Sequence, residues 1–189
     1  MKNLHNKGYF GSKRIFEFAA KNGSFTNMKW LKNIECPWDQ RVFNYIIMTR
    51  NIEIMKWLFE NNCPWDEYTF SFATITSFNN IKIFEWLKKH NCPWNKDAIY
   101  CAVIKENITN LEWLHNNGYV GSTNLMQFAA LGGNLSVIKL LKKLGKQFCT
   151  ETFNNAAHNG NLKAMKWLRA NGCPWNKFTL AYAVKNGNI

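Results

Sequence analysis

Apolar residues recur along this chain at helical spacing in short runs, and each pair of runs is closed by a compact turn. Residues 148–176 show the arrangement clearly: a run ending in Asn-Gly is followed by a second run with Leu162, Met165 and Leu168 on one face. A spacing of three to four residues is that of an amphipathic helix. The segment therefore predicts two short helices followed by the turn Gly-Cys-Pro-Trp-Asn.

The same unit recurs throughout the chain. The tryptophan of the second helix returns at Trp30, Trp57, Trp86, Trp113 and Trp167, with Leu140 in its place once. Successive gaps are 27, 29, 27, 27 and 27 residues. A fixed period in this range is typical of stacked repeats, in which each unit is too small to bury its own apolar face.

One residue of the turn sets the register, and we count repeat positions from this turn residue as position 0. The turn residues are Tyr9, Cys36, Cys63, Cys92, Tyr119, Lys146 and Cys173. We expect a single repeat array over 1–189, with units at approximately 1–8 (partial), 9–35, 36–62, 63–91, 92–118, 119–145, 146–172 and 173–189 (partial). The third full unit is two residues longer, and its insertion falls between the two helices, in the segment 75–80.

Residues at position 3 predict where each first helix begins. They are Ser12, Asp39, Asp66, Asn95, Ser122, Cys149 and Asn176. All but Cys149 are residue types that cap helix N-termini, and beside Cys149 we expect Thr150 to take this role. Glycine closes most first helices because it enters the left-handed conformation easily. Arg50 and Glu106 stand at the equivalent position, so we expect their turns to be looser or differently shaped.

Residues 152–172, TFNNAAHNGNLKAMKWLRANG, resemble the ankyrin repeat, whose pattern is T-P-L-H-x-A-A-x-x-G-H-L-x-V-V-x-L-L-L-x-x-G. The matches are Ala156-Ala157, Gly160, Leu162, Leu168 and Gly172, with Ala19-Ala20, Gly23, Ala129-Ala130 and Gly133 matching again. The Cys-Pro-Trp-Asp turn and the period of 27 residues are similar to divergent ankyrin proteins of giant DNA viruses and some protists.

The resemblance implies a protein-binding scaffold, and the shorter period implies a simplified fold. Ankyrin repeats have a period of about 33 residues, so each unit here lacks about six, in the segment that forms a β-hairpin finger in the family. We therefore expect an all-α, ankyrin-like helical repeat solenoid with shortened or absent β-hairpin fingers.

Charge narrows the class of partner. Lysine and arginine exceed aspartate and glutamate by 24 to 12, giving a net charge of +12. This charge favours an acidic partner, although such a surface also serves solubility alone. By the ankyrin resemblance, positions 4, 12 and 13 lie on an exposed concave face. The candidate partner-binding residues at these positions are Lys13, Lys21, Lys96, Lys105, Lys177 and Lys185.

Two aromatic features invite a functional interpretation. Position 9 holds Phe18, Tyr45, Phe72, Cys101, Phe128, Asn155 and Tyr182, and aromatic ladders can stack single-stranded bases. In ankyrin repeats this position is buried, so we favour a core role for it. We also expect the tryptophans of the second helices and of the turns to pack between repeats.

Chemistry that would indicate catalysis is missing from the sequence. It contains no phosphate-binding loop, nucleophile elbow or His-Glu-x-x-His motif, and the four histidines fall near helix ends in different repeats. The cysteines at the turns are expected to be small buried residues, because stacked repeats about 10 Å apart separate them too widely for disulfides or a zinc site. We expect no enzyme, no cofactor and no metal.

The sequence therefore predicts a non-catalytic interaction scaffold that binds an acidic protein on a basic concave face. Two alternatives stay open: nucleic-acid or anionic-surface binding through the same lysines, and a structural subunit that assembles end to end or is capped by another chain, since both ends fall within a repeat. No apolar run is long enough for membrane insertion. We expect an intracellular protein, in the host cytoplasm if the chain is viral, with nucleus and virion left open.

Overall fold

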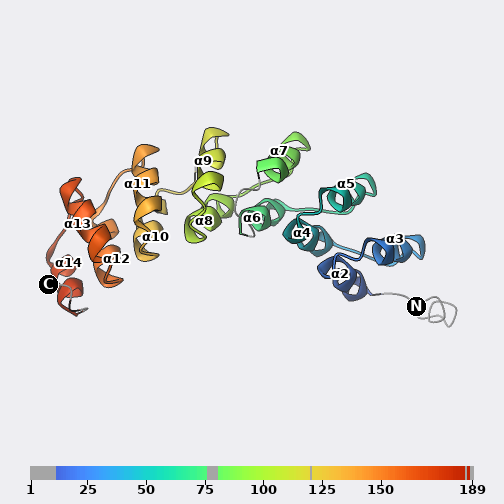
Figure 1. Cartoon of the computed structure of the whole chain (residues 1–189), viewed down its shortest axis with the longest axis horizontal. Coiled ribbons are helices and arrows are strands. Elements are labelled where there is room, and N and C mark those ends of the chain that lie inside the picture. Colours follow the sequence, from blue (N-terminus) through green and yellow to red (C-terminus); the bar gives the residue numbers. More distant parts are fainter. Residues whose placement is uncertain (1–11, 76–80, 120, 186, 188–189) are drawn as a thin grey trace. The chain divides into compact units, whose positions relative to one another are not determined.

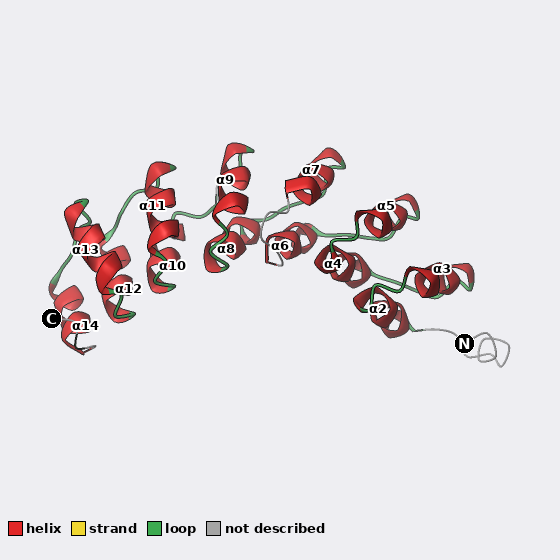
Figure 2. Cartoon of the chain, viewed as in Figure 1, coloured by secondary structure: helices red, strands yellow, loops and turns green. Residues whose placement is uncertain are grey.

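The computed structural model describes residues 12–75, 81–119, 121–185 and 187, and all regular structure in these residues is α-helical (Figure 2). The prediction of an all-α repeat fold without β-hairpin fingers is confirmed for this part of the chain. The partial unit 1–8, the turn residue Tyr9 and most of the insertion at 75–80 lie outside the described residues. The helices are α2 (Lys13–Lys21), α3 (Phe25–Asn33), α4 (Gln40–Thr49), α5 (Ile52–Glu60), α6 (Glu67–Ile75), α7 (Ile81–Lys89), α8 (Asp97–Ile104), α9 (Ile108–Asn116), α10 (Leu125–Leu131), α11 (Leu135–Lys143), α12 (Thr150–His158), α13 (Leu162–Ala170) and α14 (Lys177–Lys185).

The helices alternate between two roles along the chain (Figure 1). We call α2, α4, α6, α8, α10, α12 and α14 the first helices, and α3, α5, α7, α9, α11 and α13 the second helices. Contacts divide the chain into two compact units, Met1–Ala98 and Ile99–Ile189, with the division inside α8. In the first unit α4 packs between α2 and α6, and in the second unit α12 packs between α10 and α14. Second helices pack against the first helix of their own pair, as α3 does on α2 and α13 on α12.

Most first helices begin at the residues that the sequence indicates. The side chain of Asp39 accepts a hydrogen bond from Arg41 N (3.1 Å), and Asn176 accepts one from Phe178 N (2.9 Å). Asp66 and Asn95 cap their helices in the same way. Two expectations were wrong. Helix α10 begins two residues later than expected, with Asn124 rather than Ser122 as its N-cap residue. Cys149 is itself the N-cap residue of α12, so Thr150 is the first helical residue.

Second helices have their own caps, which the sequence reasoning missed. The side chains of Asn51, Asn107, Asn134 and Asn161 each accept a hydrogen bond from the backbone N–H three residues later. Such a bond satisfies one of the amides that the first helical turn leaves unpaired. The available signal was an asparagine recurring at position 15 of the repeat in units of standard length.

The turns at Arg50 and Glu106 have the same shape as the glycine turns, which corrects the expectation of looser ones. Arg50 has φ of 60° and Glu106 has φ of 57°, beside 62° for Gly23 and 75° for Gly133. Arg50 N also donates to Ile47 O, as Gly23 N donates to Ala20 O. The repeat therefore imposes the left-handed conformation even where a side chain opposes it, at a cost of about 1–2 kcal/mol.

The core repeats with the same period as the helices. Position 7 is buried in every unit but the last, and it is occupied by Phe16, Phe43, Phe70, Ile99, Met126 and Phe153. The alanine pairs that match the ankyrin pattern are buried as well, which lets neighbouring first helices approach closely. At position 7 of the last unit, Leu180 is exposed on α14.

Candidate partner-binding surfaces

The six candidate lysines are all exposed, and they lie at or next to the ends of three first helices. Lys13 and Lys21 are the first and last residues of α2, and Lys177 and Lys185 those of α14. Lys96 and Lys105 flank α8. Within the first unit α4 and α6 follow α2 in the stack, and within the second unit α10 and α12 precede α14. In each unit the lysines are therefore exposed, on or beside first helices that are separated by other first helices in the stack.

Lys13 also forms an ion pair within the chain. Its Nζ lies 3.9 Å from Asp39 Oδ2, on the turn that begins α4. Arg41 bridges the same region, with its guanidinium 2.8 Å from Asp39 and 2.9 Å from Glu17 on α2. Hydrogen bonds from the Arg41 side chain hold the pKa of Asp39 below its usual range. These ion pairs tie α2 to the start of α4.

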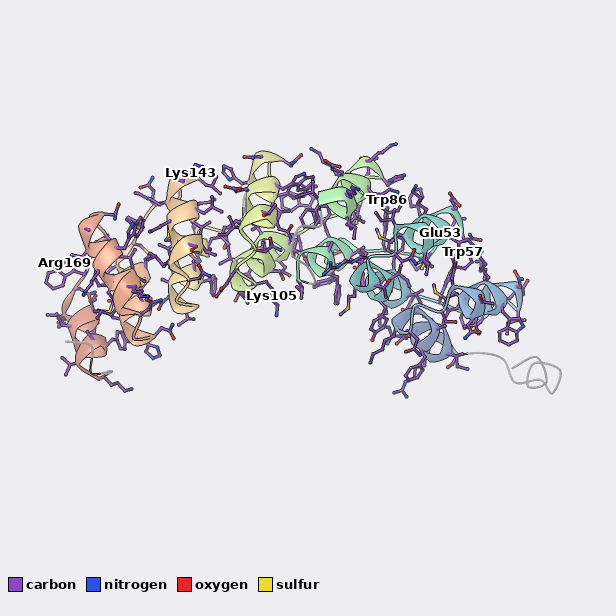
Figure 3. The ribbon with its side chains drawn as sticks, in the orientation of Figure 1. Glu53, Trp57, Trp86, Lys105, Lys143 and Arg169 are labelled. Carbon is purple, nitrogen blue, oxygen red and sulfur yellow. The ribbon has the colours of Figure 1, made fainter. Side chains whose placement is uncertain are left out.

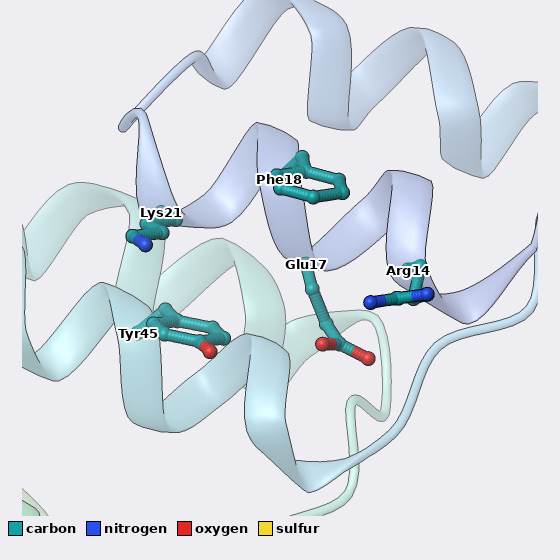
Figure 4. Close-up of a pocket in the computed structure, with 5 residues that line it drawn as sticks. All are labelled: Arg14, Glu17, Phe18, Lys21 and Tyr45. Atoms are coloured by element: carbon teal, nitrogen blue, oxygen red, sulfur yellow. The ribbon is translucent and has the colours of Figure 1, made fainter.

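Lys21 lines a small pocket formed by residues of α2 and α4 (Figure 4). The pocket is about 150 Å³ in volume and is formed by Arg14, Glu17, Phe18 and Lys21 of α2 with Tyr45 of α4. It is open and of mixed charge, and Glu17 is held by Arg41. The pocket therefore offers surface for a partner side chain rather than an enclosed site for a cofactor.

Position 12, which the ankyrin resemblance places on an exposed face, carries a row of exposed aliphatic side chains; the sequence reasoning selected only the lysines at this position. Met48 on α4 is 46% exposed and Ile75 on α6 is 36% exposed. In the second unit Ile104 on α8 is 51% exposed and Leu131 on α10 is 45% exposed. The remaining units have Lys21, His158 and Lys185 at this position, all exposed. Position 12 is thus a surface position throughout, and its aliphatic residues have no role in the core.

The aromatic ladder at position 9 lies beside this row, and it is not the buried ladder that the resemblance implied. Phe18 is 59% exposed, and Tyr45, Phe72, Cys101, Phe128, Asn155 and Tyr182 are half-buried. Position 9 precedes position 12 by one helical turn, so the two positions share a helix face. The pair Tyr100 and Phe128 shows how rings on this side contact across helices, with centroids 4.5 Å apart.

Some of the tryptophans pack between repeats as predicted, whereas Trp94 and Trp175 of the turns are 43% and 46% exposed. Trp38 of the turn contacts Phe16 of the preceding unit at 4.9 Å between ring centroids and Trp57 of its own unit at 5.9 Å. A cation from the preceding second helix covers the turn ring, as Lys32 does for Trp38 at 4.2 Å. Lys142 covers Phe148 at 4.3 Å and Arg169 covers Trp175 at 4.9 Å in the same way. Part of the positive charge therefore holds successive repeats together.

Two second helices of the second unit, α11 and α13, carry three cations each. Lys139, Lys142 and Lys143 lie on α11, and Lys163, Lys166 and Arg169 lie on α13. Neither helix contains an acidic residue. Figure 3 places Lys143 and Arg169 on the side of the second helices and Lys105 on the side of the first helices. Sequence reasoning did not consider these cations as a surface.

The cysteines are free thiols, and those at the turns are buried as predicted. The Sγ of Cys36 donates to Ser12 O (3.6 Å) and that of Cys173 to Cys149 O (3.7 Å), which links each turn to the preceding cap. Burial raises the pKa of Cys63, Cys92 and Cys173 to about 12. Within the described residues no group of three or more histidine, cysteine, aspartate or glutamate side chains could hold a metal ion.

No helix in the described part of the chain combines the length and the apolar character needed to cross a membrane. Comparison with known proteins adds no assignment: no protein-family model matches the chain, and no curated protein matches its sequence. The interpretation of function therefore rests on the surfaces described above.

Proposed function

We propose that this chain is a non-catalytic protein-interaction module of the ankyrin type, which binds a partner along the exposed face of its first helices. The observation that carries the proposal is the row of exposed aliphatic residues at position 12. Single exposed apolar side chains are normal, but a repeated set at one register on neighbouring helices is a feature of interaction surfaces. Met48 and Ile75 form such a set on the packed helices α4 and α6.

The partner on this face is acidic. Lys21 and Lys185 stand at position 12 itself, and Lys13, Lys96 and Lys177 stand at position 4, where the first helices begin. A ligand that reaches the aliphatic row therefore also meets positive charge. Apolar anchors supply most of the affinity at protein interfaces, whereas surrounding charges set association rate and partner choice. An acidic protein segment with aliphatic or aromatic anchors satisfies both features of the face.

Free, buried thiols support a place inside a cell, because cytosolic and nuclear proteins keep cysteines reduced. The ankyrin resemblance includes proteins of giant DNA viruses, and if the chain is viral we propose that it acts in the host cytoplasm. A scaffold of this kind needs neither a cofactor nor a reactive site, and its specificity lies in the exposed residues of each repeat.

Affinity purification of the tagged full chain from its native cells, after nuclease treatment, tests the proposal. The variants are Met48→Ser with Ile75→Ser, which removes the aliphatic pair, and Lys96→Glu with Lys105→Glu and Lys177→Glu, which reverses the charge. A control, Lys56→Glu with Lys82→Glu and Lys89→Glu, makes the same change of charge on exposed second-helix residues. All of these positions are exposed, so we expect each substitution to change stability by no more than about 0.5 kcal/mol.

We expect a discrete acidic protein that survives nuclease, is lost from both first-helix variants and is retained by the control. If the bound material is nucleic acid, or if it disappears with nuclease, the partner class is wrong. If concentration-dependent light scattering instead shows the purified chain assembling with itself, and no other protein co-purifies, the structural-subunit alternative replaces this proposal.

A further inference from the structure

A second surface, separate from the first-helix face, is formed by six cations on two second helices. We call Lys139, Lys142, Lys143, Lys163, Lys166 and Arg169 the α11–α13 basic face. Lys139 and Lys166 stand at equivalent repeat positions, and so do Lys142 and Arg169, because each pair is 27 residues apart. Equivalent positions of a stacked repeat face the same side. All six side chains are exposed except Lys142, which is half-buried.

A ring of the intervening turn links the two helices and orders this face. Lys142 lies over the ring of Phe148, and Phe148 in turn contacts Trp167 on α13, with ring centroids 6.0 Å apart. Arg169 is held over Trp175. Ion pairs in the described residues involve Lys13 and Arg41 but none of these six cations. Lys142 and Arg169 thus also cover rings, and no carboxylate in the described residues pairs with any of the six cations.

Acidic residues on α5, α7 and α9 limit the face to α11 and α13. Helix α3 has two lysines and no acidic residue, but the second helix that follows it, α5, carries acidic residues. Glu112 on α9 stands at the repeat position of Lys139 and Lys166. In the first unit Glu53 and Glu60 lie on α5 and Glu85 on α7. A face with net charge of one sign over two neighbouring helices is thus a property of this part of the second unit.

The residue types of the α11–α13 basic face favour nucleic acid over a protein or a membrane as its ligand. Leu162 is the exposed large apolar residue of α11 and α13, so the face lacks the cluster of apolar anchors that protein partners and membrane surfaces require. Five of its six cations are lysines, which contact phosphates without reading bases, whereas bidentate arginine contacts read guanine. We infer that the α11–α13 basic face binds the phosphate backbone of double-stranded nucleic acid without sequence preference.

The spacing of the cations suits this ligand. Lys163, Lys166 and Arg169 follow one another at three residues, which is a rise of about 4.5 Å along a helix. Phosphates on one strand of a duplex carry a charge about every 3.4 Å along its axis. The cations of α11 and α13 together can therefore contact several phosphates of one nucleic-acid strand. Binding of a small anion would instead require several donors that point at a single site.

Fluorescence anisotropy of the full chain with two unrelated fluorescein-labelled 20-base-pair duplexes tests the inference. If all six cations contact phosphates, log affinity falls with log salt with a slope of about −5, or about a thousandfold between 50 and 200 mM salt. The variant Lys139→Gln with Lys163→Gln and Lys166→Gln leaves both stacked cations in place. Its slope is expected near −3, with about a fortyfold fall over the same range.

The matched control is Lys21→Gln with Lys96→Gln and Lys105→Gln, which removes the same charge from the first helices. Binding to both duplexes with equal affinity, a reduced slope in the α11–α13 variant and an unchanged slope in the control support the inference. Equal slopes in the two variants would mean that net charge alone attracts DNA and would overturn it. Absence of binding at 50 mM salt, or displacement of the duplex by polyglutamate or phosphatidylserine vesicles at equal charge concentration, would overturn it as well. Because the two proposals use different residues, failure of one leaves the other standing.

Discussion

Lys142 holds its ammonium group 4.3 Å from the centre of the Phe148 ring, although Lys142 ends one repeat and Phe148 begins the next. The same relationship joins Lys32 to Trp38 and Arg169 to Trp175. A cation over an aromatic ring at a partly exposed site contributes about 0.5–1 kcal/mol. The period of the sequence thus repeats an interface in which a charge at the end of one second helix covers the aromatic ring of the following turn.

Replacing Lys142 by glutamine removes this interaction and keeps a side chain of similar length. We expect the free energy of unfolding to fall by about 0.5–1 kcal/mol, measured by urea denaturation followed by circular dichroism. Lys143→Gln is the matched control, because Lys143 is exposed and makes no ring contact among the described residues. Equal effects of the two substitutions would show that charge, and not the contact with Phe148, determines stability here.

The left-handed residues make a second prediction. Arg50 and Glu106 adopt a conformation that disfavours any residue with a Cβ atom. Replacement of either by glycine is expected to raise the free energy of unfolding by up to about 1 kcal/mol. The reverse change, Gly23→Ala, is expected to lower it by about 1 kcal/mol through backbone strain alone, since a Cβ at Gly23 meets no atom within 4 Å. Denaturation midpoints that move in the opposite directions would contradict the assigned backbone conformations.

The helical pairs could be predicted from the sequence because their signals are local: apolar spacing, an N-cap such as Asp39 and a fixed period. The shape of the turn at Arg50 could not, because there the hydrogen bond to Ile47 O and the packing of both flanking helices override the preference of the side chain. The ankyrin resemblance places position 12 on an exposed face, and Met48 and Ile75 are exposed there. They were missed as candidate contact residues because net charge directed attention to the lysines at the same repeat position, Lys21 and Lys185.

Thiol reactivity distinguishes the cysteines. With a pKa of about 12, the buried thiols of Cys63, Cys92 and Cys173 are about one part in ten thousand thiolate at pH 8. Burial also acts on Cys149, but hydrogen bonds from Thr152 and Gln127 outweigh it and lower the pKa of this thiol, which caps α12. We expect Cys149 to react first with a disulfide reagent at pH 8.

The rate of that fast phase is expected to rise with pH through the lowered pKa of Cys149 and to disappear in Cys149→Ser. The buried thiols should react only when urea unfolds the chain. A fast phase that persists in Cys149→Ser, or that is lost instead in Cys101→Ser, would assign the reactive thiol elsewhere.

The ion pairs of Asp39 predict a loss of stability in acid. Because hydrogen bonds from Arg41 lower the pKa of Asp39 in the folded chain, its charge contributes stability above the unfolded pKa of about 3.9. That contribution is lost as the pH falls through the lower folded pKa.

Asp39→Asn keeps an oxygen that can cap α4 but removes the charge. We expect the variant to be less stable than the original chain by about 1 kcal/mol or less at pH 7, with the difference vanishing once the pH falls below the lowered pKa of Asp39. Thermal unfolding between pH 2.5 and 7 measures it, and Arg41→Gln provides the test of cause. In an Arg41→Gln background the Asp39→Asn substitution should have little effect on stability at any pH, because the guanidinium that holds the carboxylate is gone. An undiminished effect in that background would show that Lys13, and not Arg41, is the stabilising partner of Asp39.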